Sequence, residues 1–255
     1  MRALRSALAK LDTSATPSVA HKEPAPPPLP GSRRKAAAVK HLPWLVLLSG
    51  TITATARAAD QPSWVSESRT GCKVWNSYPK PGERVEWSGG CVSGFASGNG
   101  LLQWYVHGKL NEQFEGEMAG GKLNGQGAYI WANGNRYEGK FHDGEPAGHG
   151  VYHWANGAYY EGELLDGQPN GWGATADQDG AYEGEFRDGQ RNGRGIQTWT
   201  DGSRYEGEYR DGRPHGIGSL FDAPSRQTFN GIWRDGCFRD GDRRATVGVP
   251  AAECQ

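Results

Sequence analysis

Hydrophobic and polar residues alternate in short segments over the second half of the chain, and these segments recur. In Tyr182–Phe186, Tyr, Gly and Phe occupy alternate positions, and two Glu residues lie between them. Successive side chains of a strand point to opposite faces, so this alternation predicts a strand with one aromatic and one acidic face. A second alternating segment follows each such strand, as at Tyr129–Trp131 and Tyr152–Trp154. Each pair of segments predicts a β-hairpin.

The paired segments form a repeat of about 23 residues that runs over residues 114–236. Five full copies and one partial copy begin at Phe114, Tyr137, Tyr160, Tyr182, Tyr205 and Phe229. One hairpin cannot bury its aromatic face alone, so the copies are stable only when they stack. We therefore predict an all-β fold, an elongated single-layer antiparallel β-meander built from tandem hairpin repeats of about 23 residues.

Glycines that follow Asp or Asn mark the turns of this pattern. Asp143-Gly144 ends the first strand of a repeat, and Asn133-Gly134 joins one repeat to the next. Both central residues of a type I′ turn have positive φ, which favours these pairs, so we expect type I′ turns at both places. Gly148 and Gly150 are expected to extend the first loop. Gly139, inside a strand, is expected to leave room for a neighbouring aromatic ring.

Composition supports short strands over helices. Gly makes up 39 of the 255 residues, and the chain carries 10 Trp and 10 Tyr. The buried apolar area must therefore come from aromatic rings spaced by glycines. The formal net charge is −1, but residues 1–42 carry an excess of basic residues, which leaves the body of the chain acidic. An acidic body argues against nucleic acid as a partner and supports binding to anionic lipid only weakly.

The pattern Y-E-G-E-x-x-x-G-x-x-x-G-x-G resembles the MORN repeat (membrane occupation and recognition nexus) over residues 114–236, about half the chain. The resemblance implies an open, twisted, elongated sheet with no enclosed core, and a scaffold protein, sometimes proposed to bind lipid. Residues 59–113 resemble the leader of secreted bacterial MORN proteins. The third repeat departs from the pattern at residues 176–178 and the fifth at Pro224, so we expect both to be locally weak or bent.

The first sixty residues are typical of a segment that directs export rather than of a folded domain. Residues 1–41 are basic and Pro-rich without periodicity, which predicts a disordered extension. Residues 42–58 form a short apolar run that ends in Ala-Arg-Ala. This predicts a signal peptide cleaved after Ala58 and a secreted, periplasmic protein. An uncleaved inner-membrane anchor or a chance apolar run in a cytosolic chain would also fit. Two explanations account for the residues that precede this signal. Either the start of the chain is incorrectly assigned and initiation occurs at Val39, or these residues are the basic cytoplasmic tail of an uncleaved anchor.

Two cysteine-containing segments flank the repeats. We interpret residues 59–113 as an N-terminal cap with a degenerate repeat around Trp87, and residues 237–255 as a C-terminal tail. The cysteines are Cys72, Cys91, Cys237 and Cys254. In an oxidising compartment we expect them to form disulfides, for which three connectivities exist. The local pairing, 72 with 91 and 237 with 254, would clamp each end of the array. The chain has no C-x-x-C motif, so we expect no zinc site.

The sequence offers little that resembles catalytic chemistry. His149 and His153 lie four residues apart without a matching carboxylate, so we predict surface histidines rather than metal ligands. Pairs of Glu recur in the repeats, at 115/117, 161/163, 183/185 and 206/208. Because a catalytic site is built once, we interpret these pairs as a solvated sheet face, paired with Arg187, Arg204 or Arg210. No phosphate-binding loop, nucleophile elbow or zincin motif is found, so we expect no cofactor and no catalytic residue.

The aromatic residues of the second strands remain as candidates for binding. Tyr129, Trp131, Tyr152 and Trp154 form the fullest ladder, in the first two repeats. Either these rings pack on one another, or an open sheet leaves them exposed as a face for a partner.

We expect a non-enzymatic scaffold of the bacterial cell envelope that mediates protein or surface interactions, with an unknown protein or envelope surface as partner. Two alternatives remain. One is a membrane-anchored protein that binds lipid surfaces. The other is an enzyme that processes an envelope polymer. It would need a non-repeated carboxylate with a perturbed pKa, or a Cys/His pair, in a cleft, and the sequence shows neither.

Overall fold

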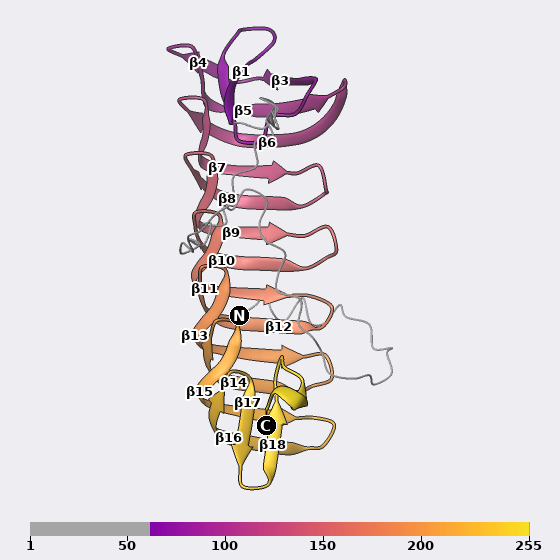
Figure 1. Ribbon diagram of the computed structural model, residues 1–255. Coiled ribbons are helices and arrows are strands. Elements are labelled where there is room, and N and C mark those ends of the chain that lie inside the picture. Colours follow the sequence, from indigo (N-terminus) through magenta and orange to yellow (C-terminus); the bar gives the residue numbers. More distant parts are fainter. Residues whose placement is uncertain (1–61, 255) are drawn as a thin grey trace, which may run out of the picture.

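The computed structural model describes residues 62–254, and an antiparallel sheet dominates them (Figure 1). The predictions for residues 1–41 and 42–58, including the signal peptide, the anchor and the start at Val39, lie outside the described residues. Within residues 62–254, no helix is long and apolar enough to cross a membrane. The elements are β1 (Ser63–Ser66), β2 (Lys73–Asn76), β3 (Glu83–Trp87), β4 (Gly90–Val92), β5 (Phe95–Val106), β6 (Lys109–Ala119), β7 (Lys122–Ile130), β8 (Arg136–His142), β9 (Glu145–His153), β10 (Tyr159–Leu165), β11 (Gln168–Ala176), β12 (Gly180–Arg187), β13 (Gln190–Trp199), β14 (Arg204–Arg210), β15 (Arg213–Asp222), β16 (Gln227–Arg234), β17 (Cys237–Asp240), β18 (Arg243–Thr246) and the 3-10 helix η2 (Ala251–Glu253).

The sheet is a continuous meander. From β5 to β18 each strand pairs antiparallel with the next strand along the chain. The pairing also crosses repeat boundaries, because β9 pairs with β8 of its own hairpin and with β10 of the next. The repeats therefore stack along one long axis (Figure 1). The predicted all-β meander of tandem hairpins is confirmed.

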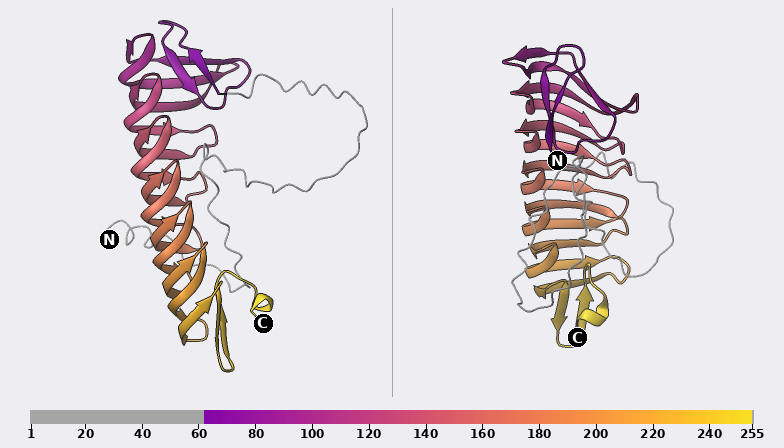
Figure 2. Two further views of the ribbon diagram at one scale, coloured as in Figure 1. Left: turned by 60° about the vertical axis from the view of Figure 1, so that its left-hand side comes forward. Right: turned by 45° about the horizontal axis from the view of Figure 1, so that its top comes forward.

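A row of glycines crosses the sheet, one from each strand between β5 and β16. Cross-strand pairing aligns Gly100, Gly116, Gly127, Gly139, Gly150, Gly162, Gly173, Gly184, Gly195, Gly207, Gly218 and Gly231. We call this row the glycine ladder. In each hairpin of the array the register shifts directly after the ladder glycine of the first strand. A shift of this kind bends a strand, so the sheet is curled along one long side, as Figure 2 shows.

The first aromatic residue of each repeat lies across the glycine ladder. A Cβ atom at Gly150 would lie 2.5 Å from ring carbons of Tyr137, so only glycine leaves space for the ring. The hydroxyl group of Tyr137 donates a hydrogen bond to the carbonyl oxygen of Lys140, three residues along (3.1 Å). Tyr160, Tyr182 and Tyr205 make the same bond in their own repeats. The expectation that strand glycines make room for a ring is correct.

The bend creates a buried core, contrary to the expectation of a sheet with no enclosed core. The rings of Tyr137 and Phe141 are 5.1 Å apart, edge to face, although four residues of straight strand span about 13 Å. Tyr137, Tyr152, Tyr160, Tyr182 and Tyr205 have no exposed surface. Rings on the two sides of the bend therefore bury one another in a continuous line along the array.

The two kinds of turn differ. In Asp143-Gly144 both residues have positive φ, at 51° and 95°, as a type I′ turn requires. In Asn133-Gly134 only the glycine has positive φ, so the prediction of type I′ turns between repeats is wrong. There the Asn133 side chain instead accepts a hydrogen bond from the backbone N–H of Asn135 (3.0 Å), which stabilises a longer loop.

The second strands start earlier than the sequence suggested. The strand β9 begins at Glu145, directly after the turn, so Gly148 and Gly150 lie inside the sheet rather than in a loop. Strand β11 of the third repeat is as long as β9, although residues 176–178 depart from the pattern. In the fifth repeat Pro224 follows the end of β15 and lies in the turn before β16, where the proline costs no sheet hydrogen bond.

A disulfide lies at each end of the array. Cys72 pairs with Cys91, with Cα atoms 5.9 Å apart, and Cys237 pairs with Cys254, with Cα atoms 5.5 Å apart. The first bridge joins the residue directly before β2 to β4 in the cap. In the same region the Trp87 ring lies against the backbone of Gly100 and its indole N–H donates to the carbonyl oxygen of Gly90 (2.8 Å). Trp87 therefore occupies the position that Tyr holds in the repeats.

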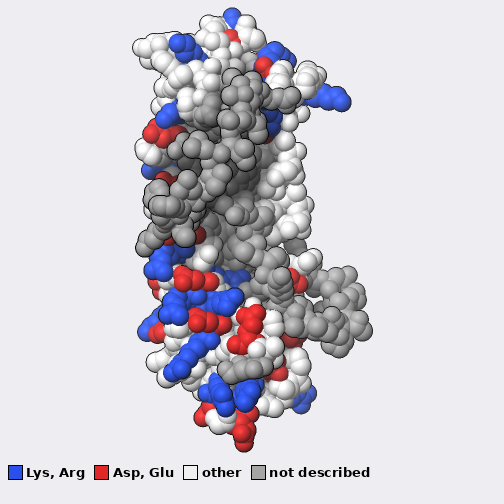
Figure 3. All heavy atoms as spheres, in the orientation of Figure 1, with Lys and Arg blue, Asp and Glu red and all other residues white. Residues whose placement is uncertain are grey.

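The outer face of the sheet carries mixed charge (Figure 3). Glu185 and Glu208 accept hydrogen bonds from the backbone N–H groups of Arg194 (3.0 Å) and Ile217 (3.3 Å), and so stabilise the bulged part of the strand. Arg204 pairs with Glu206 at 2.6 Å. The expected partners of the two other arginines were wrong, because Arg187 and Arg210 pair with Asp211 and Asp235 in neighbouring turns.

Candidate functional site

Stacked aromatic rings run from the cap into the second repeat. Ring centroids lie 5.6 Å apart between Trp104 and Tyr129, 4.6 Å between Tyr129 and Trp131, 5.3 Å between Trp131 and Tyr152, and 4.5 Å between Tyr152 and Trp154. The structure thus brings the four candidate residues of the ladder into one stack, with Trp104 of β5 added at its end. We call these five residues the aromatic stack.

Most of the aromatic stack is buried, so for three of its four candidate residues the structure favours the alternative in which the rings pack on one another. Tyr152 has no exposed surface, and Tyr129 and Trp154 are 9% and 8% exposed. The bend of the sheet and the edge contacts between neighbouring rings explain this burial. Trp131 is partly buried and packs against the core. The indole N–H of Trp154 is buried without a hydrogen-bond partner in the described part of the chain.

The stack opens at its cap end into a pocket of about 350 Å³. Strand β2, the loop after it and the first residue of β3, Glu83, lie along one side. Strands β5 to β9 and the turns between them provide the remainder. A hydrogen bond from the Trp75 N–H to the carbonyl oxygen of Gly121 (2.7 Å) fixes β2 against the turn between β6 and β7. Six aromatic side chains line the pocket: Trp75, Tyr78, Trp104, Tyr129, Trp131 and Phe141. The pocket therefore includes two of the four ladder candidates, Tyr129 and Trp131.

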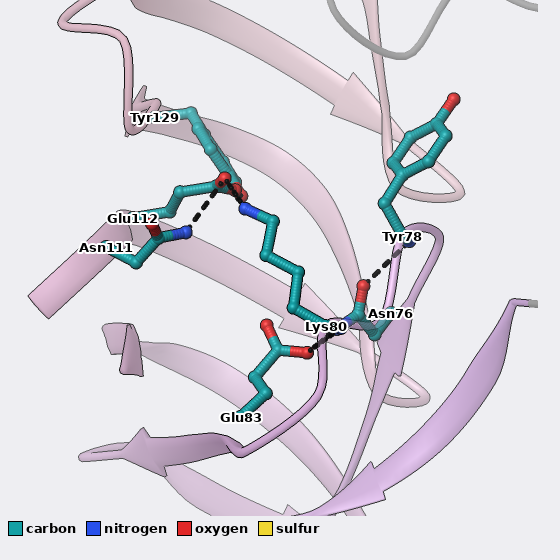
Figure 4. A network of polar contacts seen from close by, with 7 residues as sticks. All are labelled: Asn76, Tyr78, Lys80, Glu83, Asn111, Glu112 and Tyr129. Carbon is teal, nitrogen blue, oxygen red and sulfur yellow. Dashed lines mark hydrogen bonds and ion pairs between the residues drawn. The ribbon is translucent and has the colours of Figure 1, made fainter. Parts of the chain in front are cut away.

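Charged and polar side chains form a network in the same pocket (Figure 4). Glu112 Oε1 accepts from Lys80 Nζ (2.9 Å) and from Asn111 Nδ2 (3.2 Å), and its Oε2 accepts from the Tyr129 hydroxyl (2.6 Å). Glu83 Oε2 accepts from Asn76 Nδ2 (2.6 Å) and from the Lys80 backbone N–H (3.1 Å). The network thus holds two carboxylates in fixed positions beside the rings.

Burial changes the ionisation of this network. Burial raises the pKa of Glu83, and the negative charge of Glu112 adds to this effect. Burial also raises the pKa of Tyr129 well above its usual value, and the neighbouring Glu112 carboxylate raises it further. Tyr129 is therefore a neutral hydrogen-bond donor to Glu112 throughout the physiological pH range.

Sequence analysis missed the cap side of the pocket. Tyr78, Lys80, Glu83 and Glu112 belong to no repeat, and at least 29 positions separate the first three from Glu112. Glu83 is a non-repeated carboxylate with a raised pKa that lines a pocket, which is the feature that the enzyme alternative requires. Since only the folding of β2 onto the turn at Gly121 brings these residues together, no local pattern could have revealed them.

The other candidate residues do not form a site. His149 and His153 face Glu163 and Tyr159 across the pair of strands β9 and β10. Within residues 62–254, no group of three or more His, Cys, Asp or Glu side chains is arranged to hold a metal ion. The pocket beside the cap is therefore the best candidate for function on this part of the chain.

The comparison with protein-family models supports the repeat assignment. The MORN repeat family model matches residues 114–136, 137–159, 160–173, 182–204 and 205–223. Among solved structures, the chain is similar to the TCP domain of SAS-4 (dCPAP) of Drosophila melanogaster, solved in complex with a proline-rich motif of Ana2 (dSTIL). That likeness has 13% sequence identity and a TM-score of 0.33, and it covers 73% of this chain and 96% of the other. No curated protein matches the chain.

The five family matches lie along residues 114–223. The first four begin at Phe114, Tyr137, Tyr160 and Tyr182, each inside the first strand of a hairpin, and the third ends at residue 173 inside β11. The fifth begins at Tyr205 with strand β14. Residues 114–223 of the chain therefore carry five consecutive MORN repeats.

Proposed function

We propose that the chain is a non-enzymatic scaffold of the bacterial cell envelope that binds a protein or envelope-surface partner in the pocket between its cap and its first two repeats. MORN repeats are in general consistent with a repeat-based binding or scaffold role. The observation that carries the proposal is the pocket itself. It joins six aromatic rings to two fixed carboxylates.

The arrangement of the array suits a scaffold. Strands pair without interruption from β5 to β18, so the described part of the array is one hydrogen-bonded sheet. Each Asp-Gly turn also donates a backbone hydrogen bond to the preceding hairpin, as from Gly144 to Leu123 (2.9 Å) and from Gly167 to Pro146 (3.0 Å). Such a sheet resists bending and holds a pocket at one end in a fixed orientation to the rest.

The envelope location rests on the two disulfides and on the amino-terminal sequence. Disulfides are typical of oxidising compartments such as the periplasm. The apolar run before Ala58 is consistent with export. We expect the mature chain to begin near Ala59, and the intact mass of protein purified from its native host tests this. A mass that includes residues 1–40 would contradict both cleavage and a start at Val39.

The binding role is tested by capture from envelope extract with a matched pair of variants. Tyr78 lines the pocket and is 59% exposed, whereas Trp172 lies on the outer face and is 54% exposed. Replacing either by Ala removes an exposed ring at little cost to folding. The proposal expects a specific partner that wild type and Trp172→Ala retain and Tyr78→Ala loses. Equal retention by both variants would contradict it.

One observation favours the second candidate, an enzyme that acts on an envelope polymer. Glu83 and Glu112 lie in one pocket, and the pKa of Glu83 is raised. Against this, Glu112 already accepts hydrogen bonds from Lys80 and Tyr129, so both of its oxygens are engaged within the protein. Incubation of the protein with purified envelope glycan distinguishes the two. Product release that Glu83→Gln abolishes would support the enzyme.

A further inference from the structure

We propose that the pocket beside the cap binds a saccharide, an inference that rests on the binding role proposed above for the same pocket. The proposal follows from three properties of the pocket: its flat aromatic surfaces, its fixed hydrogen-bond acceptors and its mixed charge.

The aromatic walls fit the apolar faces of sugar rings. Trp75, Trp104 and Trp131 line the pocket together with Tyr129, and Tyr78 contributes an exposed ring. A pyranose ring presents axial C–H groups on its faces and hydroxyl groups around its rim. Its faces therefore pack on indole and phenol rings, which provide large contact area at low entropic cost. The volume of about 350 Å³ is within the range of small-molecule sites.

The carboxylates of the pocket can accept hydrogen bonds from the hydroxyl groups around the rim of a sugar ring. An ionised carboxylate is an acceptor with about four lone-pair positions, and the contacts from Lys80, Asn111 and Tyr129 use three of those of Glu112. Both hydrogen bonds of Glu83 end on Oε2, which leaves Oε1 without a partner among the described residues. A ligand rich in O–H donors satisfies these acceptors, and their fixed positions reduce the entropic cost of binding.

The charges of the pocket disfavour ionic ligands. Three carboxylates, of Glu83, Glu112 and Glu145, line it together with the two ammonium groups of Lys80 and Lys122. A cationic ligand would be repelled by the lysines and an anionic ligand by the carboxylates, whereas a neutral polyol experiences neither repulsion. An extended peptide is also disfavoured, because β6 to β9 are paired on both sides and offer no free strand edge for main-chain hydrogen bonds.

Titration of the full chain with defined oligosaccharides tests the proposal. The probes are soluble tetramers of β-1,4-linked N-acetylglucosamine, β-1,4-linked glucose and α-1,4-linked glucose, followed by intrinsic tryptophan fluorescence and calorimetry. We expect at least one probe to bind wild type and Trp172→Ala with equal affinity. We expect Tyr78→Ala to raise its dissociation constant about tenfold or more, with the melting temperature unchanged. Glu83→Gln, which removes one acceptor without changing shape, should weaken binding as well.

Several outcomes would overturn the inference. Binding of none of the three tetramers excludes it, and binding that Tyr78→Ala leaves unchanged places the sugar elsewhere. A synthetic peptide with the sequence of residues 21–30, which is rich in proline, serves as the rival probe. If only the peptide binds, with dependence on Tyr78, the pocket is a peptide site and the saccharide inference is wrong. Capture from envelope extract that depends on Tyr78 but does not respond to added sugar refutes the saccharide while leaving the binding role intact.

Discussion

Replacing Gly150 by Ala tests the role of the glycine ladder. Gly150 has no positive φ, so alanine fits its backbone and only the space around its Cβ opposes the change. That Cβ would lie 2.5 Å from Cε2 and Cζ of Tyr137, where carbon atoms normally stay about 3.5–4.0 Å apart. The Tyr137 ring has no exposed surface and contacts Phe141 at 5.1 Å, so it has no free direction in which to move.

The expected loss of stability follows from these contacts. Overpacking of this kind costs about 1–3 kcal/mol. Displacement of the ring also weakens the hydrogen bond from the Tyr137 hydroxyl to Lys140, which contributes about 1 kcal/mol. Alanine also reduces the conformational entropy of the unfolded chain, which stabilises the folded state by about 0.4–1 kcal/mol and offsets part of this loss. We expect a net loss of about 2–3 kcal/mol, which lowers the melting temperature of a chain of this size by roughly 5–10 °C.

A double-mutant cycle separates the ring contact from other effects. Tyr137→Leu removes the atoms that the new Cβ would meet, so Gly150→Ala in that background should cost about 0.5 kcal/mol or less. Unfolding in urea, followed by circular dichroism, measures all four proteins. An equal cost of Gly150→Ala in both backgrounds would refute the argument that the ladder exists to accommodate the rings.

Three further predictions concern the core, the cap and the pH. Trp154→Ala should lower the free energy of unfolding by about 3–5 kcal/mol, because the ring is buried, and any loss of binding should track the loss of folded protein; an unchanged urea midpoint would contradict this. Replacing Cys72 and Cys91 together by Ser should cost about 3 kcal/mol, measured in the same way, and an unchanged midpoint would show that the cap does not need its bridge. Burial raises the pKa values of Tyr137 and Tyr152 to about 12, so the folded state holds these protons while the unfolded chain releases them near pH 10. The contribution of these tyrosines to stability should therefore be constant below pH 10 and fall between pH 10 and 12 by about 1.4 kcal/mol per pH unit for each tyrosine; a stability that stays flat from pH 10 to pH 12 would refute the assignment.

The sequence predicted the hairpins but not the bend between their halves. Alternation in Tyr182–Phe186 and the Asp-Gly turns define strand faces and hairpin ends, because both signals are local. The bend depends on register, since Gly139 and Gly150 contact the Tyr137 ring only when the two strands pair in one particular alignment. Without that alignment, the same tyrosines are equally consistent with an exposed face.

The candidate site was predictable only in part. Tyr129 and Trp131 follow from the repeat, and they do line the pocket. Tyr78 and Glu83 come from the cap, which has no periodic pattern to indicate which face its side chains occupy. Their position depends on the hydrogen bond from Trp75 to Gly121, a long-range contact that no local signal encodes.

Site-specific photocrosslinking in the native host tests the central claim, that the pocket beside the cap is where the scaffold binds. A photoreactive phenylalanine derivative replaces Tyr78 in one protein and Trp172 in another. Both positions carry exposed rings, but Tyr78 lines the pocket and Trp172 lies on the outer face of the sheet. Irradiation of living cells should give a discrete, higher-mass adduct from position 78 and none from position 172. Adducts of equal yield at both positions, or an adduct from position 172 alone, would contradict the claim.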